Sequence, residues 1–365
     1  MPIHQGVAAL AVLGFAGCND GGTGPALPRT YAALSVGGYH TCALTETGTA
    51  YCWGDNTLYQ LADSVLNLPT PTAVAGRMTF TSVSAGGFHT CALTVAGAAY
   101  CWGSNFAGQL GDGTRINHAT PAPVSGGLVF TMLAAGGNQT CGITPAAAAY
   151  CWGAAGLGDG VSIVALVPVR VFGDLAFATL SAGNSHTCGV TVASVAYCWG
   201  VNKYGQLGDG TTTDRSTPVP VAGGLAFVAL AASGLHTCGL TTSGDPFCWG
   251  SFERNLVPAP IAGGQTFTSI SSVGFHTCAL TPAHEAYCWG DNLFGQLGSG
   301  AGDATPVPHA VAGGLSFSVV SAGSDHTCGL TTAHLAYCWG YNGGGQLGVG
   351  IVNPGGSTPV RVIGE

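Results

Sequence analysis

The sequence predicts an all-β protein, a seven-bladed β-propeller with four-stranded antiparallel blades. One stretch recurs seven times, and its clearest copy is GGFHTCALTVAGAAYCWG, from Gly86 to Gly103. The seven tryptophans are each followed by glycine, and successive copies lie 49, 50, 47, 50, 40 and 50 residues apart. A period near fifty residues is typical of propeller arrays. Because it runs unbroken from Tyr31 onward, we expect residues 31–365 to form one closed body.

Each copy contains the patterns of four short strands. In the second copy, Met78–Gly87 alternates apolar and polar residues and ends in Gly-Gly, which predicts a strand and a break. His89–Thr94 and Ala98–Gly103 predict a hairpin, joined by the turn Val-Ala-Gly. After a loop rich in Gly and Asn, Ala119–Gly127 contains prolines that suit an edge strand. Four such strands make one blade.

The two ends of the array suggest how the ring closes. Every blade from the second onward is preceded by a strand of the type TPVPVAGG, but none precedes Tyr31. The chain finishes with STPVRVIGE, from Ser357 to Glu365, which has the same pattern. We therefore expect this C-terminal strand to complete the first blade, leaving no free sheet edge.

Fourteen of the fifteen cysteines form seven pairs with identical spacing. In the first copy, a hairpin places Cys42 opposite Cys52, at a separation that a disulfide tolerates. Zinc knuckles need closer ligands, so metal sites are disfavoured, and buried free thiols are the remaining alternative. Seven disulfides indicate an oxidising compartment. The expected pairs are Cys42–Cys52, Cys91–Cys101, Cys141–Cys151, Cys188–Cys198, Cys238–Cys248, Cys278–Cys288 and Cys328–Cys338. Each tryptophan points away from its neighbouring cysteine, which predicts a place between blades.

The first thirty residues have the pattern of an export segment. Residues 1–18 contain a short apolar run, typical of a signal peptide, and end in Phe-Ala-Gly-Cys. This ending resembles a bacterial lipoprotein box, which implies lipidation of Cys18, although Phe15 replaces the usual Leu and no Lys or Arg precedes the run. Residues 19–30 are expected to form a flexible tether. The alternative is a freely secreted protein with one unpaired thiol.

The charge distribution excludes one class of partner. Only 7% of residues are charged, the net charge is −8, and Lys203 is the single lysine. Nucleic-acid binding needs a basic patch, so neither DNA nor RNA is an expected partner.

The repeat HTCALT…AYCWG followed by N-x-x-GQLG-x-G resembles that of the regulator of chromosome condensation family. The resemblance covers nearly all of residues 31–365 and implies a seven-bladed propeller closed by strands from both termini. Functions in this family are diverse, so the resemblance implies only binding of a protein through loops on one face. Nucleotide exchange relies on an inserted β-wedge, and no copy here has an insertion.

No catalytic or cofactor-binding set stands out. Six histidines recur at one position, and we expect each to bond the backbone of the adjacent glycine-rich turn rather than a metal; they are His40, His89, His186, His236, His276 and His326. Asp112, Asp159 and Asp209 lie singly in Gly-Asp-Gly turns, which is too few carboxylates for calcium. We expect no cofactor and no enzymatic activity, the alternative being an enzyme with a site at the channel mouth.

Aromatic residues in the loops after Trp-Gly are the candidate binding residues. They should emerge on one face of the ring, where aromatic side chains suit protein recognition. These residues are Tyr59, Phe106, Tyr204, Phe294 and Tyr341. Packing beneath their own loops is the competing interpretation. We expect a monomer that binds an unidentified protein at the cell envelope or outside the cell, anchored to a membrane only by lipid. A carbohydrate- or cell-wall-binding adhesin is the alternative.

Overall fold

The computed structural model describes residues 29–161, 163–251 and 255–364. The expected signal peptide, the lipidation site at Cys18 and nearly all of the expected tether lie outside these residues. The described residues contain strands, turns and loops but no helix, and thus no helix able to cross a membrane.

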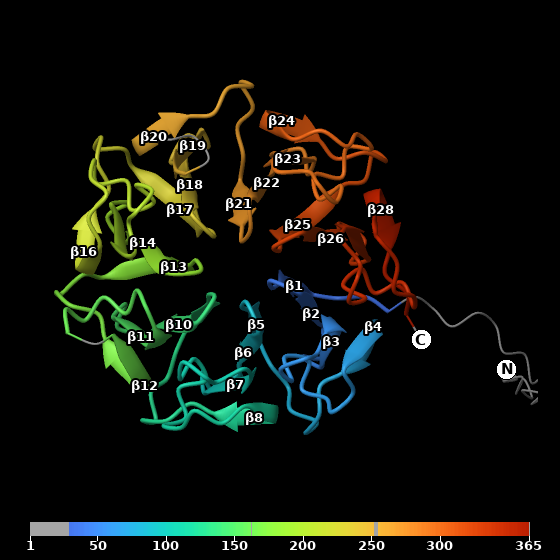
Figure 1. Ribbon diagram of the computed structural model, residues 1–365, viewed down its shortest axis with the longest axis horizontal. Coiled ribbons are helices and arrows are strands. Elements are labelled where there is room, and N and C mark those ends of the chain that lie inside the picture. The colour runs from blue at the N-terminus through green and yellow to red at the C-terminus, as the bar shows by residue number, and fades with distance from the viewer. Residues whose placement is uncertain (1–28, 162, 252–254, 365) are drawn as a thin grey trace, which may run out of the picture.

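Twenty-eight strands form seven four-stranded antiparallel sheets, arranged as blades around a central axis (Figure 1). Blades 1 to 4 consist of β1 (Ala33–Val36), β2 (His40–Leu44), β3 (Ala50–Asp55), β4 (Asn67–Ala73); β5 (Ser82–Ala85), β6 (His89–Leu93), β7 (Ala99–Gly103), β8 (His118–Pro123); β9 (Met132–Ala135), β10 (Gln139–Ile143), β11 (Ala149–Ala154), β12 (Val164–Arg170); and β13 (Phe177–Ala182), β14 (His186–Thr191), β15 (Ala196–Gly200), β16 (Arg215–Pro220). Blades 5 to 7 consist of β17 (Phe227–Ala232), β18 (His236–Thr241), β19 (Pro246–Gly250), β20 (Asn255–Pro260); β21 (Ser269–Ser272), β22 (His276–Leu280), β23 (Ala286–Gly290), β24 (Thr305–Ala310); and β25 (Phe317–Ala322), β26 (His326–Thr331), β27 (Ala336–Gly340), β28 (Gly356–Arg361). The predicted seven-bladed architecture is confirmed.

The second and third strands of each blade form the expected hairpin. In blade 1, Cys42 lies directly opposite Cys52. All seven predicted cysteine pairs form disulfides, with Cα–Cα distances of 4.0 to 4.1 Å. The register between the third and fourth strands changes at the Trp-Gly pair, in blade 2 between Cys101 and Gly103. Gly103 has φ +101°, and a Cβ there would lie 2.8 Å from the Cα of His89. Only glycine fits this position without strain.

The hydrophobic core is divided into seven layers, one between each pair of neighbouring blades. In every layer the disulfide of one blade packs against the tryptophan of the next. Cys42 and Cys52, for example, share a cluster with Trp102. All seven tryptophans are at most 1% exposed. Because side chains alternate along a strand, each disulfide and its neighbouring tryptophan face opposite interfaces, as predicted.

The expected closure by the C-terminal strand is wrong. β28 pairs with β27 and is the outer strand of blade 7, whereas blade 1 already has its own outer strand, β4. A strand of the type TPVPVAGG is the fourth strand of the blade whose hairpin precedes it in sequence, not the first strand of the blade that follows. β28 follows β27 in sequence through the loop 341–355, whereas pairing with blade 1 would leave blade 7 with three strands and give blade 1 a fifth.

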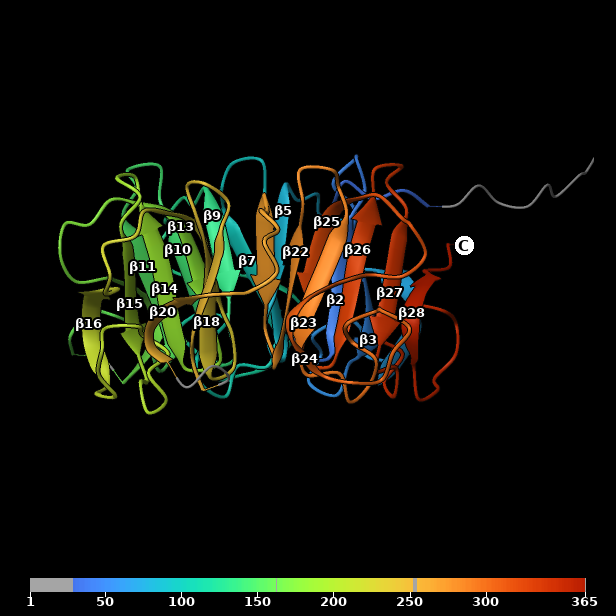
Figure 2. The same cartoon turned by 90° about the horizontal axis from the view of Figure 1, so that it is seen from above.

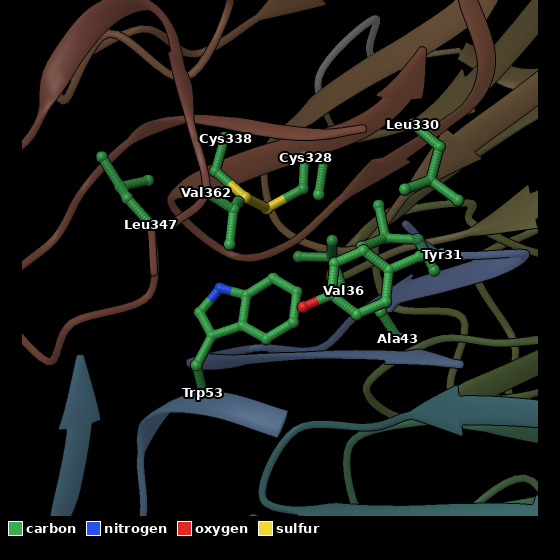
Figure 3. Close-up of a cluster of buried hydrophobic side chains, with 11 residues drawn as sticks. Tyr31, Val36, Ala43, Trp53, Cys328, Leu330, Cys338, Leu347 and Val362 are labelled. Carbon is green, nitrogen blue, oxygen red and sulfur yellow. A yellow bond between two sulfur atoms is a disulfide. The ribbon is translucent and has the colours of Figure 1, made fainter. Parts of the chain in front are cut away.

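The ring is instead closed by side-chain packing between blades 7 and 1. Figure 3 shows Trp53 facing the Cys328–Cys338 disulfide, with Val362 and Tyr31 in the same cluster. Hydrogen bonds also cross this seam, among them Tyr31 N–H to His334 O (2.9 Å), Val36 N–H to Ser321 Oγ (3.0 Å) and Gly350 N–H to Pro69 O (2.8 Å). The repeated histidine linkage crosses it as well, between His326 Nε2 and Thr41 Oγ1 at 3.0 Å. Blades from the two ends of the chain thus stand side by side (Figure 1).

The antiparallel strand order gives the ring two distinct faces, seen edge-on in Figure 2. We call one of them the loop face. It contains the turns between the first and second strands and the loops between the third and fourth strands, such as residues 37–39 and 56–66 in blade 1. The opposite face contains the hairpin turns and the connections from one blade to the next.

Candidate partner-binding face

The repeated histidines link neighbouring blades beneath the loop face. His40 Nε2 lies 2.8 Å from Thr90 Oγ1 in the next blade. The Thr90 hydroxyl in turn donates to the carbonyl of Gln60, at 2.9 Å. Since a hydroxyl has one proton, Thr90 must accept from the histidine, which places the imidazole proton on Nε2. The same bonds join His89 to Thr140 and Thr140 to the carbonyl of Gln109.

The histidines are therefore structural, but their expected partner was wrong. They bond a threonine of the next blade rather than the glycine-rich turn beside them. Burial lowers the pKa of His40, His89, His186, His276 and His326 to about 3, and that of His236 to about 4. They remain neutral at ordinary pH. The described residues contain no group of three His, Cys, Asp or Glu side chains that could hold a metal ion.

Five of the seven tryptophan indoles share the carbonyl acceptor used by the threonines, the exceptions being Trp53 and Trp289. Trp102 Nε1–H donates to Gln60 O at 3.0 Å, and Trp339 Nε1–H donates to Gln296 O at 2.9 Å. The short blade 5 lacks the GQLG segment that supplies this carbonyl. Among the described residues, the buried Trp289 Nε1 has no acceptor, and Thr277 donates to Ser272 Oγ instead. The described part of blade 5 thus lacks the carbonyl that links a blade to the tryptophan of the next one.

The long loops are held rigid by their own side chains. In blade 2, Asn105 Oδ1 accepts from Leu110 N–H (3.0 Å), and its amide donates to Asp112 and to the Thr114 carbonyl. Gln109 Oε1 accepts from Ala107 N–H at 2.9 Å. Equivalent bonds to the asparagine oxygen occur in blades 1, 4, 6 and 7. The loop face is therefore a preorganised surface.

Two of the three Gly-Asp-Gly carboxylates accept hydrogen bonds from residues of their own blades. Asp112 accepts from His118 Nε2 at 2.7 Å and from Thr114 N–H at 2.9 Å. Asp209 accepts from Arg215 Nε at 2.9 Å. These bonds hold the pKa of both carboxyls below its usual value, although burial acts in the opposite direction. Each of these carboxylates thus connects residues of its own loop and stabilises the loop conformation.

The innermost strands of the seven blades line a cavity of about 200 Å³ at the axis of the ring, which we call the channel. Its lining residues are small or apolar. Five blades place a serine in this lining whose hydroxyl accepts a backbone N–H from the next blade: Ser35, Ser84, Ser181, Ser271 and Ser321. Blades 3 and 5 have alanine there, Ala134 and Ala231. The serines tie the blades together around the axis.

The five predicted aromatic residues all lie in loop-face segments. Tyr59, Phe106, Tyr204 and Phe294 are exposed, whereas Tyr341 is half-buried. They are spread over five blades, so the structure does not gather them into one cluster. Phe294 and Tyr341 alone among them are in contact, edge to face with ring centroids 4.9 Å apart. The alternative of packing beneath their own loops applies best to Tyr341.

Three further aromatic residues of the loop face were not among the predicted set. They occupy the position just before the repeated histidine, at the rim of the channel. Tyr39 stacks on Phe88 with ring centroids 4.9 Å apart, and Phe275 is 46% exposed. Their shared place in the repeat could have identified them. The described chain has six exposed aromatic side chains, of which five lie on the loop face and one, Phe172, on the opposite face.

The fold and its repeated Cys-Trp-Gly hairpins define the protein as a propeller built of one repeat type. The model of the regulator of chromosome condensation (RCC1) repeat matches residues 47–93, 96–143, 195–240 and 284–330. A second model of this repeat matches residues 31–60, 80–109, 177–206, 267–296 and 317–346. The chain therefore belongs to the RCC1 repeat family. Among curated proteins, none matches this sequence.

Solved structures share the fold at low sequence identity. Prp20p from Saccharomyces cerevisiae is 21% identical, with a TM-score of 0.79 over 88% of this chain and 87% of Prp20p. Human WBSCR16 is 20% identical, with a TM-score of 0.75 over 83% of this chain and 87% of that one. The ectodomain of the Physcomitrella patens receptor kinase CR4 is 22% identical, with a TM-score of 0.59 over 85% and 73%.

Some of these relatives bind other proteins. Yeast RCC1 (Prp20) has been crystallised with Kap60 bound, and binding of Prp20p to Gsp1p and histones has been characterised. Protein binding is therefore an activity found among the structural relatives of this chain.

Proposed function

We propose that this protein is an exported, non-catalytic interaction module that binds a partner protein through its loop face. The observation that carries the proposal is the unequal distribution of exposed aromatic side chains between the two faces. Aromatic residues on a rigid surface supply contact area at low entropic cost, as binding hot spots do. The asparagine and glutamine bonds described above supply that rigidity.

The seven disulfides indicate an oxidising, extracellular environment for the folded body. We propose that residues 1–18 direct export and that Cys18 is lipidated, anchoring the propeller to the cell envelope. Incorporation of labelled fatty acid, lost in Cys18→Ser, tests the anchor. Unchanged incorporation in that variant, or none in the wild type, would reject it.

Affinity capture tests the binding function. The oxidised protein is immobilised and exposed to envelope and secreted proteins, and bound species are identified by mass spectrometry. We expect one enriched protein, lost when Tyr204→Ala and Phe294→Ala are combined. Phe172→Ala is the matched control, since Phe172 is an exposed aromatic residue of the opposite face.

Two results would overturn the proposal. Loss of the partner in Phe172→Ala with retention in the double variant would move binding to the opposite face. Retention of wall polysaccharide in place of any protein would favour the adhesin.

A further inference from the structure

One side of the loop face has carboxylates without cations. Residues 30–76 and 255–360, which include blade 1, blade 6 and nearly all of blade 7, contain no lysine or arginine. Their loop-face segments contain five aspartates, which we call the acidic sector: Asp55, Asp63, Asp291, Asp303 and Asp325. Four arginines flank these two ranges in sequence. Arg29, Arg77 and Arg361 lie toward the opposite face, before β1, after β4 and at the end of β28, and Arg254 lies outside the described residues.

The acidic sector is not neutralised within the described chain. The three ion pairs of the described residues lie outside this sector and involve Asp112, Asp174 and Asp209, all in blades 2 to 4. Asp55 and Asp291 accept hydrogen bonds only from uncharged groups, Thr57 N–H and the Gln296 amide. Asp325, half-buried at the channel rim, makes no side-chain hydrogen bond or ion pair with the described residues. Burial and then the negative charge of Asp291 raise its pKa.

Aromatic rings border these carboxylates. Burial raises the pKa of Tyr39, and the negative charges of the nearby Asp325 and Asp55 raise it further. The ring of Tyr39 also stacks on Phe88, and the ring of Tyr341 contacts Phe294 edge to face. A cationic side chain placed here would gain both carboxylate attraction and contact with ring faces.

The spacing of the carboxylates favours a polypeptide over a metal ion. No three acidic, histidine or cysteine side chains of the described chain are close enough to hold one cation. Carboxylates that are spread over three blades instead suit several cations carried on one extended segment. Electrostatic complementarity of this kind selects partners and speeds association.

We propose that the acidic sector, with its bordering aromatic rings, binds a lysine- and arginine-rich segment of the partner protein. This inference rests on the proposed function and specifies the chemistry of the partner. It assigns the contact to blades 6, 7 and 1 rather than to the whole loop face.

The test uses the full-length oxidised protein and a fluorescent peptide of alternating arginine and glycine. The control peptide has citrulline in place of arginine, which keeps the shape and removes the charge. We expect anisotropy to show binding of the arginine peptide alone, weakening as NaCl rises from about 50 mM to about 300 mM. Equal binding of the citrulline peptide would overturn the proposal.

Two double variants locate the site. Asp55→Asn with Asp325→Asn should weaken peptide binding about tenfold, since each half-buried charge near the surface contributes a few-fold. Glu46→Gln with Glu285→Gln removes the same charge from the opposite face and should leave affinity within about twofold. Equal losses in both pairs, or no loss in the first, would overturn the proposal. So would complete displacement of the peptide by calcium at low concentration, which would indicate a metal site.

The two hypotheses fail separately. If the captured partner is released by the Tyr204 and Phe294 changes but not by Asp55→Asn with Asp325→Asn, the loop face binds it without the acidic sector. If only Phe172→Ala releases the partner, the proposed function itself fails.

Discussion

Each repeated histidine has a single ring proton, on Nε2, which it donates to a threonine of the next blade. Thr90 donates to a carbonyl and must accept from His40, so Nε2 is protonated and Nδ1 is not. Nδ1 of His40, His89, His186, His276 and His326 has no hydrogen-bond partner in the described chain. A second proton would place an unpaired charge in the interior, which burial penalises strongly. These imidazoles are therefore fixed in the neutral state.

This neutrality predicts acid sensitivity. The pKa of His89 falls from 6.5 in the unfolded chain to about 3 in the fold, so between these values only the unfolded state binds the proton. The free energy of unfolding should therefore fall as pH decreases from about 6.5 towards about 3, by about 1.4 kcal/mol per pH unit for each histidine. Guanidinium titrations at several pH values measure this slope.

Blade 3 supplies the control, because Gln139 replaces the histidine there and donates to Gly183 O at 3.0 Å. His89→Gln should reduce the slope by about 1.4 kcal/mol per pH unit in the same window. An unchanged slope would show that His89 does not resist protonation in the fold.

The tryptophans differ in one bond, and this difference can be measured. Trp339 donates to Gln296 O, whereas the equally buried Trp289 has no acceptor among the described residues. Trp339→Phe should therefore cost about 1 kcal/mol more stability than Trp289→Phe, since both lose similar packing. Chemical denaturation of the two variants gives the comparison. Equal losses would mean that the indole bond contributes nothing.

At the scale of the element, each blade depends on its central hairpin. Strands such as β6 and β7 are short, their residues are mostly small, and the disulfide between them is fully buried. The cross-link restricts the unfolded chain, and its sulfur atoms also fill the layer beneath the next tryptophan.

Removing one disulfide should therefore weaken one hairpin and one interface together. Cys91→Ala with Cys101→Ala opens a loop with a sequence separation of 10 residues and should lower the free energy of unfolding by about 3 kcal/mol. Hydrogen exchange should increase in β6, β7 and the adjoining β10. Unchanged stability would show that the strand ladder alone holds the hairpin.

At the scale of the whole molecule, the weakest point is the seam between blades 7 and 1. Other neighbouring blades are joined by the chain itself, but this pair is held by packing around Trp53 and by a few hydrogen bonds. No strand is exchanged between the two ends. The N- and C-terminal blades are therefore each complete and associate as separate units.

Val362 tests this view of the seam. It is 7% exposed in the seam cluster, and its N–H donates to Ala336 O. Val362→Ala should destabilise the ring by about 1–3 kcal/mol and speed hydrogen exchange in both β1 and β26. Val221→Ala is the matched control, since Val221 N–H donates to Ala196 O in the same way within blade 4. Exchange confined to blade 7 in Val362→Ala would contradict the seam.

Much of this molecule follows from local pattern. The period of the Cys-x9-Cys-Trp-Gly unit predicts the number of blades, because each unit is one hairpin that cannot bury both faces alone. Alternation along a strand places Cys52 and Trp53 on opposite sides, and pairing across the turn places Cys42 against Cys52. The candidate loop residues could likewise be assigned to one face from strand order alone. These features depend on neighbours in sequence.

Only the tertiary structure decided what depends on distant residues. The sequence does not mark where a repeat begins, so whether Ser357–Glu365 completes blade 1 or blade 7 was settled by pairing of β28 with β27. The partner of His40 is a threonine 50 residues away. The nearness of Asp325, Asp55 and Tyr39 arises because ring closure brings the last blades against the first. Periodicity determined the blades, and packing between blades determined the seam, the hydrogen-bond linkages and the acidic sector.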